Sequence, residues 1–247
     1  MSSLATSFVV FLCVFGGALL GIALRSVLPE HHLSAETKDV VRAAMALVST
    51  MSALVLGLLV ASAKGTYDTQ KDELTSLSAN VTLLDRVLGH YGSEAASARP
   101  LLKDAVADTL SHISQGVGAV AAPNEKNQTI YDAVLQLEPQ NDRQKSLKTE
   151  AQNLLMTIGR TRALMLAQAQ NTISFTLLGV VVFWLTVNFV SFGLYAKPNA
   201  TATAALFLAA ISVAGALLLI LEMDRPYSGL IHISDAPLRD ALSRLGN

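Results

Sequence analysis

The sequence of 247 residues contains a single cysteine, Cys13. One cysteine excludes a disulfide bond within the chain. Its neighbours Leu12 and Val14 are apolar, so we expect Cys13 to be a small buried hydrophobic residue. The sequence also lacks a glycine-rich phosphate loop, a His-Glu-x-x-His metal motif and a nucleophile elbow. We therefore expect no enzyme activity, no metal site and no cofactor.

An excess of basic charge is absent as well. The formal net charge is −1, and residues 64–171 contain 11 Lys and Arg against 12 Asp and Glu. A protein that binds nucleic acid presents a basic stripe to the phosphate backbone, and this composition provides none. We therefore expect no nucleic-acid partner.

Charged residues are missing from four long stretches of the chain, which are 1–24, 43–63, 172–195 and 200–221. A helix rises about 1.5 Å per residue, so about 20 apolar residues cross a hydrocarbon core of about 30 Å. The whole chain is 51% apolar and only 15% charged. These features predict an all-α integral membrane protein with four transmembrane helices that contact the lipid bilayer.

The predicted spans divide the chain into four parts: 1–63 with the first two transmembrane helices, 64–171 as a soluble helical bundle, 172–221 with the last two transmembrane helices, and 222–247 as a C-terminal segment. Apolar residues at helical spacing run from Tyr67 to Leu88, and no proline separates them from span two. A second helical pattern begins at Asp142 and leads into span three. We therefore expect extensions of helices two and three to form the bundle.

The C-terminal segment has the pattern of a short amphipathic helix. Asp235 can cap it, and its first turn tolerates Pro237. The apolar stripe consists of Leu238, Ala241, Leu242 and Leu245. We expect this stripe to be buried against the bundle, with Arg225 paired to a carboxylate such as Asp68 or Asp85.

Four spans place both termini and residues 64–171 on one face of the membrane. Basic residues near the span ends number six on that face: Lys64, Lys71, Arg160, Arg162, Arg225 and Arg239. They number four on the opposite face: Arg25, Lys38, Arg42 and Lys197. The positive-inside rule then predicts that the termini and the bundle are cytoplasmic in a multi-pass protein of the cell membrane.

Span two differs in composition from span three. It is rich in small and hydroxyl residues, whereas span three carries bulky aliphatic and aromatic side chains. Small and hydroxyl residues suit either close helix packing or a face in contact with water. Asn188 in span three is expected to find a hydrogen-bond partner across a helix interface. The charges Glu222, Asp224 and Arg225 form either a solvated or paired helix end, or a ring of symmetry copies that biases ion selectivity.

Two strings of residues resemble signatures of the bacterial bestrophin-like domain family. The first is Asp-Arg-Val-Leu-Gly-His-Tyr-Gly at 85–92, which follows the Tyr-Asp pair at 67–68, and the second runs from Glu222 to Ser234. The resemblance covers nearly the whole chain. It implies four spans and kinship with bestrophins, which are pentameric anion channels with a pore lined by their second helix and with cytosolic helical extensions. Span two has no aromatic residue, so the constriction of true bestrophins cannot be transferred residue for residue.

These observations lead to the hypothesis of a homo-oligomeric ion channel in the bacterial inner membrane, with a pentamer and anions such as chloride implied by the resemblance. Because one copy of span two cannot enclose a pore, conduction of inorganic ions requires assembly. The pore-lining candidates are Met51, Leu54, Val55 and Leu58 for an apolar constriction, and Ser49 and Ser52 for hydration. The alternative is a membrane-anchored sensor or scaffold whose bundle binds a ligand or a protein partner. A membrane enzyme is the third and least favoured hypothesis, because the sequence shows no group of acid-base or metal-binding residues in or near the spans.

Overall fold

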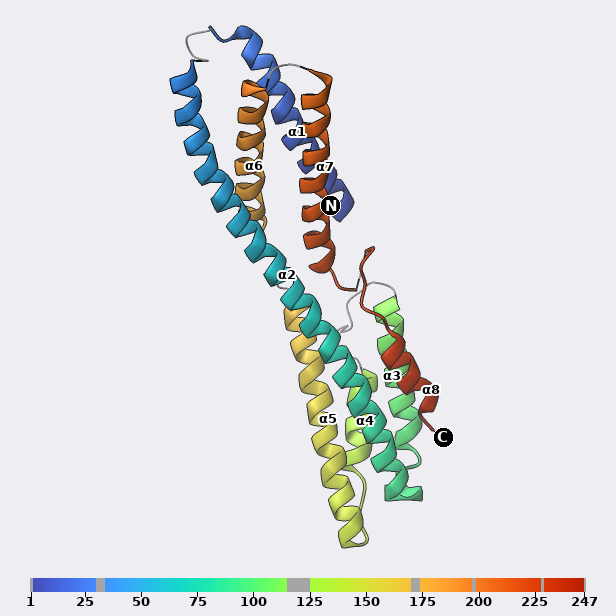
Figure 1. Ribbon diagram of the computed structural model, residues 1–247. Helices are drawn as coiled ribbons and strands as arrows, with labels where there is room; N and C mark the ends of the chain where they lie inside the picture. The colour runs from blue at the N-terminus through green and yellow to red at the C-terminus, as the bar shows by residue number, and fades with distance from the viewer. Residues whose placement is uncertain are drawn as a thin grey trace. The chain divides into compact units, whose positions relative to one another are not determined.

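The computed structural model describes residues 2–29, 34–114, 125–169, 174–196, 199–227 and 229–246. Every regular element in these ranges is a helix (Figure 1). The elements are α1 (Ser3–Val27), α2 (Ala35–Tyr91), the short 3₁₀ helix η2 (Ser93–Ala95), α3 (Ala98–Ser114), α4 (Glu125–Leu135), α5 (Asp142–Ala169), α6 (Phe175–Tyr195), α7 (Ala200–Met223) and α8 (Ala236–Arg244).

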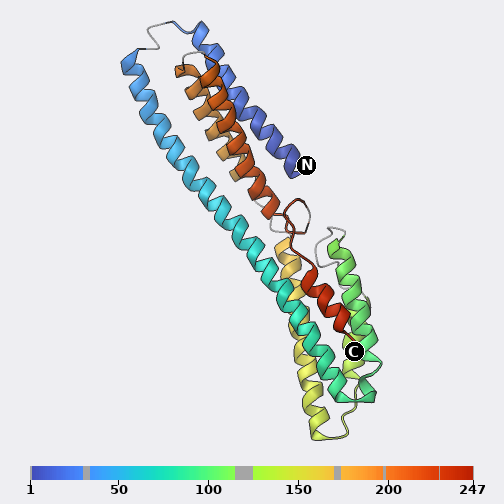
Figure 2. The same cartoon turned by 45° about the vertical axis from the view of Figure 1, so that its right-hand side comes forward.

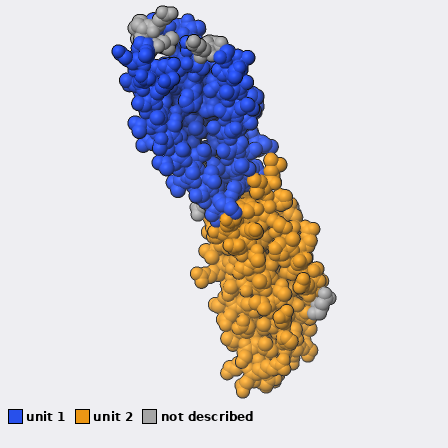
Figure 3. Space-filling model, viewed as in Figure 1, with its two compact units in different colours: residues 1–65, 173–224 blue, residues 66–172, 225–247 orange. Residues whose placement is uncertain are grey.

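The chain divides into two compact units (Figure 3). The first unit, which holds the apolar spans and is called the membrane unit, comprises residues 1–65 and 173–224. The second comprises residues 66–172 and 225–247 and is called the soluble unit after the expectation from the sequence. Helix α2 contributes residues to both. Four helices, α1, α2, α6 and α7, are long and apolar enough to cross a bilayer, which confirms the four predicted spans and a multi-pass membrane protein.

In the membrane unit, α1 packs against α6 and α7 (Figures 1 and 2). Glycines bring the backbones of α1 and α6 close together. A Cβ atom at Gly21 would collide with the carbonyl oxygen of Val190, and one at Gly193 would collide with the carbonyl oxygen of Ala18. Gly17 lies one turn before Gly21 and faces Thr186. In lipid, the hydrophobic effect does not bring apolar helices together, because the lipid tails are equally apolar. Close van der Waals contact therefore contributes much of the stability of helix association.

Cys13 is exposed, so the expectation of a buried position was wrong. Val10 and Val14 are buried and occupy the packed face of α1. Because the helix turns by about 100° per residue, the residue before Val14 lies outside that face.

The soluble unit has a continuous apolar core. Its most buried side chains come from α2, α3, α4, α5 and α8, and include Leu74, Leu84, Leu88, Leu102, Val134, Ala151, Met165 and Leu238. Helix α8 forms where Asp235 and Pro237 indicated, and it packs on α3 (Figures 1 and 2). The apolar stripe of α8 is thereby buried in its own chain.

Helix α2 is continuous from span two into the soluble unit, as the pattern predicted. It ends at Tyr91, and the following Gly92 has a φ of 122°, a conformation that favours glycine. Span three is different: α5 ends at Ala169, and Ser174 lies outside both α5 and α6. The expected unbroken helix into span three is therefore wrong at Ser174, whose φ of −59° and ψ of 112° are not helical, and residues 170–173 lie outside the described residues.

The expected turn at 196–199 includes residues 197 and 198, which lie outside the described residues. At the C-terminal end of this turn, the Asn199 side chain accepts a hydrogen bond from the backbone amide of Ala202 at 2.6 Å and caps the N-terminus of α7. At its near end, the Arg25 guanidinium donates to the carbonyl oxygens of Leu194 and Ala196. The cation thus satisfies the C-terminal carbonyls of α6.

Candidate functional site

Helix α2 has one covered face and one broad uncovered face in the membrane unit. Ser52, Leu59 and Ala63 are buried on the covered face. Only 11% of its apolar membrane window is buried, against 33% in α1, 28% in α6 and 17% in α7. Among the four membrane helices, α2 therefore offers the largest share of its surface to something outside the described chain.

Three of the predicted pore residues lie on the uncovered face. Met51, Leu54 and Leu58 are 56%, 70% and 64% exposed and recur at spacings of three and four. Leu47 continues the same row and is 70% exposed. Val55 is half-buried and lies at the edge of this face. The row forms one apolar stripe along the helix.

The two predicted hydration residues point into their own chain. The Ser49 hydroxyl donates to Asn188 Oδ1 on α6 at 2.7 Å, and Asn188 in turn donates to the Trp184 carbonyl at 3.0 Å. Ser52 is only 3% exposed, and its hydroxyl donates to the Val48 carbonyl at 2.7 Å. The expected cross-helix partner of Asn188 is confirmed. A place on a water-filled axis does not fit the burial of Ser52.

Small residues form the rest of the uncovered face of α2. They are Ala43, Ala46, Thr50, Ala53, Gly57 and Ala61, all exposed. A Cβ at Gly57 would meet no atom within 4 Å. Small side chains such as these are typical of helix contacts in membranes.

A groove of about 400 Å³ lies between α2 and α6 near the N-terminal end of α2. Both polar and apolar residues line this groove: Arg42, Met45, Ala46, Ser49, Ser191, Phe192, Tyr195 and Ala196. The Lys38 ammonium lies 5.8 Å from the centre of the Tyr195 ring. The Arg42 guanidinium forms an ion pair with the Asp39 carboxylate, with 3.8 Å between Nη1 and Oδ1. From the sequence, Lys38 and Arg42 were expected only to help orient the chain in the membrane. Their spacing of four residues was the signal that they share one face of α2.

The three charges at the end of span four do not form one exposed group. Glu222 is 4% exposed, Asp224 caps the C-terminus of α7, and Arg225 is exposed. A ring of Glu222 side chains around a pore is not favoured by this burial.

Arg225 was expected to pair with a carboxylate such as Asp68 or Asp85, and Asp85 has a different partner. Asp85 accepts two hydrogen bonds of 2.8 Å from Arg99 on α3, in a bidentate ion pair. These bonds raise the pKa of the Arg99 guanidinium, while burial opposes the rise. Arg99 was not singled out from the sequence, because 14 residues and the turn after α2 separate it from Asp85. The end of α2 is thus fixed to α3.

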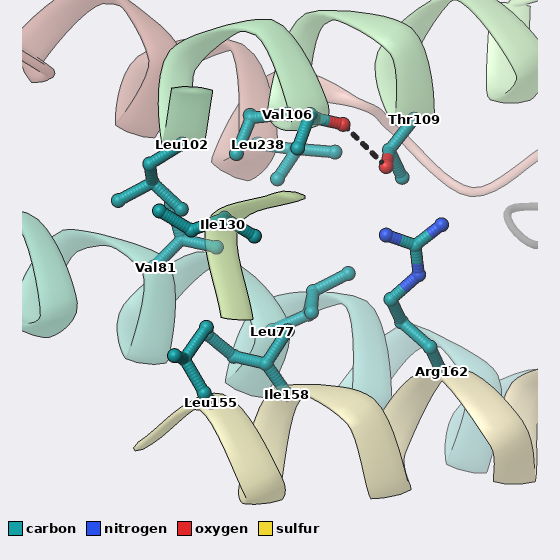
Figure 4. Close-up of a pocket in the computed structure, with 11 residues that line it drawn as sticks. Leu77, Val81, Leu102, Val106, Thr109, Ile130, Leu155, Ile158, Arg162 and Leu238 are labelled. Atoms are coloured by element: carbon teal, nitrogen blue, oxygen red, sulfur yellow. Dashed lines mark hydrogen bonds between the residues drawn. The ribbon is translucent and has the colours of Figure 1, made fainter. Parts of the chain in front are cut away.

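The soluble unit contains a small apolar pocket of about 40 Å³ (Figure 4). Figure 4 shows Arg162 directed toward Thr109, whose hydroxyl donates to the Ala105 carbonyl at 2.9 Å. Burial lowers the pKa of Arg162, and Asp108 partly opposes this. A cavity of this size holds about one or two water molecules, so it is too small for an organic substrate. In the described ranges, no three His, Cys, Asp or Glu side chains gather as a metal site.

The sequence profile of a protein family described as Bestrophin-like domain matches residues 12–238 of this chain. No curated protein and no solved structure matches it.

Proposed function

Because the chain belongs to the Bestrophin-like domain family, we propose that it is one subunit of an oligomeric ion channel that conducts anions. The observation that carries this proposal is the uncovered face of α2, since only 11% of its membrane window is buried in the chain. A membrane helix with small residues on an open face needs either lipid or another protein surface beside it.

Self-association accounts for both parts of this face. Small residues such as Ala53 and Gly57 allow the helices of neighbouring subunits to approach closely. The apolar stripe with Met51, Leu54 and Leu58 would then face the axis of the assembly. Kinship with bestrophin channels supports a pentamer, in which five copies of α2 surround the pore.

Permeation through this assembly would be passive and would involve no catalysis. Leu54 and Leu58 would form a constriction that gates by excluding water. Thr50, which is exposed on the same face, would offer a hydroxyl to a permeating ion. Lys38 and Arg42 would raise the local concentration of anions such as chloride at one end of the pore.

For the orientation, we propose that the termini and the soluble unit are cytoplasmic in the bacterial inner membrane, as the basic residues near the span ends indicate. The test uses impermeant thiol labelling of intact cells in a Cys13→Ala background. A cysteine at Val27, which is 78% exposed, should be labelled, and one at the exposed Gln136 should be protected. The opposite result would reverse the orientation.

Ion flux from liposomes tests the channel itself. Purified protein should release chloride faster than empty liposomes, and Leu54→Ala should increase the flux about tenfold because it widens and wets the constriction. Leu208→Ala on α7 is the matched control, since Leu208 is 63% exposed and is expected to face lipid. It should leave the flux unchanged.

Imaging of the detergent-purified particle gives an independent readout of assembly. A ring with an axial opening beside α2 is expected. Background flux from a correctly assembled protein, together with tight binding of a soluble partner to the helical bundle, would reject the channel and favour the sensor or scaffold.

A further inference from the structure

A cluster of one buried and three partly buried polar side chains lies in the soluble unit, outside the uncovered face of α2. Glu73 of α2 accepts a hydrogen bond of 2.8 Å at Oε1 from the side-chain amide of Gln168 on α5. Tyr227, which follows α7, interacts with the same carboxylate: burial and then the charge of Glu73 raise the pKa of its hydroxyl. Gln70 lies one helical turn before Glu73 and is only 1% exposed. We refer to these four residues as the Glu73 cluster.

Each member of the cluster has a polar atom without a partner. Glu73 Oε2, Gln168 Oε1, Gln70 Oε1 and the Tyr227 hydroxyl are shielded from solvent and form no hydrogen bond with the described residues. Buried polar atoms in native proteins are nearly always satisfied, by protein, by water or by an ion. Four such atoms associated with one carboxylate therefore indicate a ligand.

The chemistry of the four atoms shows what this ligand must supply. The carboxylate oxygen and the two amide oxygens can only accept, whereas the Tyr227 hydroxyl can donate one hydrogen bond. Even if Tyr227 donates to one of the oxygens, two acceptors remain. Burial raises the pKa of Glu73, and the hydrogen bond from Gln168 lowers it. Neither of these two causes is a positively charged side chain. A water molecule could satisfy acceptors but could not neutralise the carboxylate.

We propose that the Glu73 cluster binds one monovalent alkali-metal cation, K⁺ or Na⁺, through these oxygen atoms. Hard cations prefer carboxylate, amide and hydroxyl oxygens. The single carboxylate neutralises one positive charge, whereas a divalent ion would leave a buried excess of charge. The ion would link α2, α5 and the segment after α7. This cation site does not require that the protein conducts ions.

Thermal unfolding of the full-length protein in detergent tests the site. At pH 8 and constant ionic strength, KCl or NaCl should raise the unfolding midpoint by about 3 °C relative to N-methyl-D-glucamine chloride, in a saturable manner. Glu73→Gln should abolish this salt-specific rise. Asp72→Asn removes the same charge from the adjacent exposed position and should retain it.

Sodium-23 relaxation provides a second measurement that does not depend on stability. Bound Na⁺ should broaden the sodium signal, and K⁺ should compete with it. Tyr227→Phe should weaken the binding about tenfold, while Tyr131→Phe on the exposed face of α4 should not.

Equal midpoints in all three salts, or a response that survives in Glu73→Gln, would overturn the proposal. It would also fail if KCl and NaCl left the pH dependence of the midpoint unchanged, since a proton alone would then neutralise the carboxylate. A response to micromolar CaCl₂ without any response to K⁺ or Na⁺ would reject a monovalent ion.

Discussion

The two units of this protein bury their apolar residues in opposite ways. In the soluble unit, helices α2, α3, α4, α5 and α8 enclose a common core, in which Leu84 is fully buried. In the membrane unit, large apolar side chains such as Leu47 and Leu54 are 70% exposed. Water drives the first arrangement, whereas lipid is as apolar as the side chains and provides no such drive. Exposure of leucine therefore has a different meaning in each unit.

The difference also changes what holds each unit together. In the soluble unit, apolar burial is the main contribution. In the membrane unit, stability depends on close backbone contact at Gly21 and Gly193 and on the hydrogen bond between Ser49 and Asn188. Substitutions of one kind should therefore have unequal effects in the two units.

The largest effect is expected from Leu84→Ala in the soluble core. The substitution removes a side chain that is 0% exposed and leaves a cavity, so it should lower the free energy of unfolding by about 3–4 kcal/mol. Thermal unfolding in detergent measures the change. The adjacent Leu83 is 45% exposed, and Leu83→Ala should change stability by less than about 1 kcal/mol. Equal effects at both positions would contradict a packed core.

Gly21→Ala is expected to be the most damaging small substitution in the membrane unit. The added methyl group meets the Val190 carbonyl, which belongs to the backbone and cannot rotate away. We expect a loss of about 2 kcal/mol, because α1 and α6 must separate. Gly16→Ala adds the same methyl group where no atom lies within 4 Å. If Gly16→Ala were equally damaging, close contact at Gly21 would not explain the result.

Ser49→Ala should have a smaller effect, of about 1 kcal/mol, since it removes one hydrogen bond between α2 and α6. Thr50→Ala is the control, because the Thr50 hydroxyl donates to the Ala46 carbonyl of its own helix and so does not join two helices among the described residues. A thermal midpoint measured in the same detergent compares the two. Little difference between them would mean that Asn188 finds another partner.

The smallest effect concerns the pH dependence of the soluble unit. Burial raises the pKa of Glu73 above its ordinary 4.5, so the folded state binds this proton more tightly than the unfolded state. In N-methyl-D-glucamine chloride, the unfolding midpoint relative to Glu73→Gln should therefore increase as the pH falls from 8 toward 5. Added KCl should reduce this slope. A midpoint difference that increases with pH instead would contradict the raised pKa.

Local patterns were sufficient to predict the four spans, the continuation of α2 and helix α8, but not the break before α6. Four uncharged stretches predicted the spans, and an unbroken apolar period predicted that α2 continues from span two. The Pro237 position and the following stripe predicted α8. Length, periodicity and helix capping act within a few residues, so they can be read directly along a chain.

The direction in which each face points could not be predicted in the same way. Small and hydroxyl residues of span two occur on more than one side of its helix. Composition therefore did not distinguish Ser52, which is buried, from Thr50, which is exposed. The partner of Ser49 is 139 residues away in the sequence. Pairs such as Asp85 with Arg99, and the association of Glu73 with Gln168 and Tyr227, likewise arise only when separate helices meet. Periodicity places residues around one helix axis, but the packing of neighbouring helices decides which of them are buried.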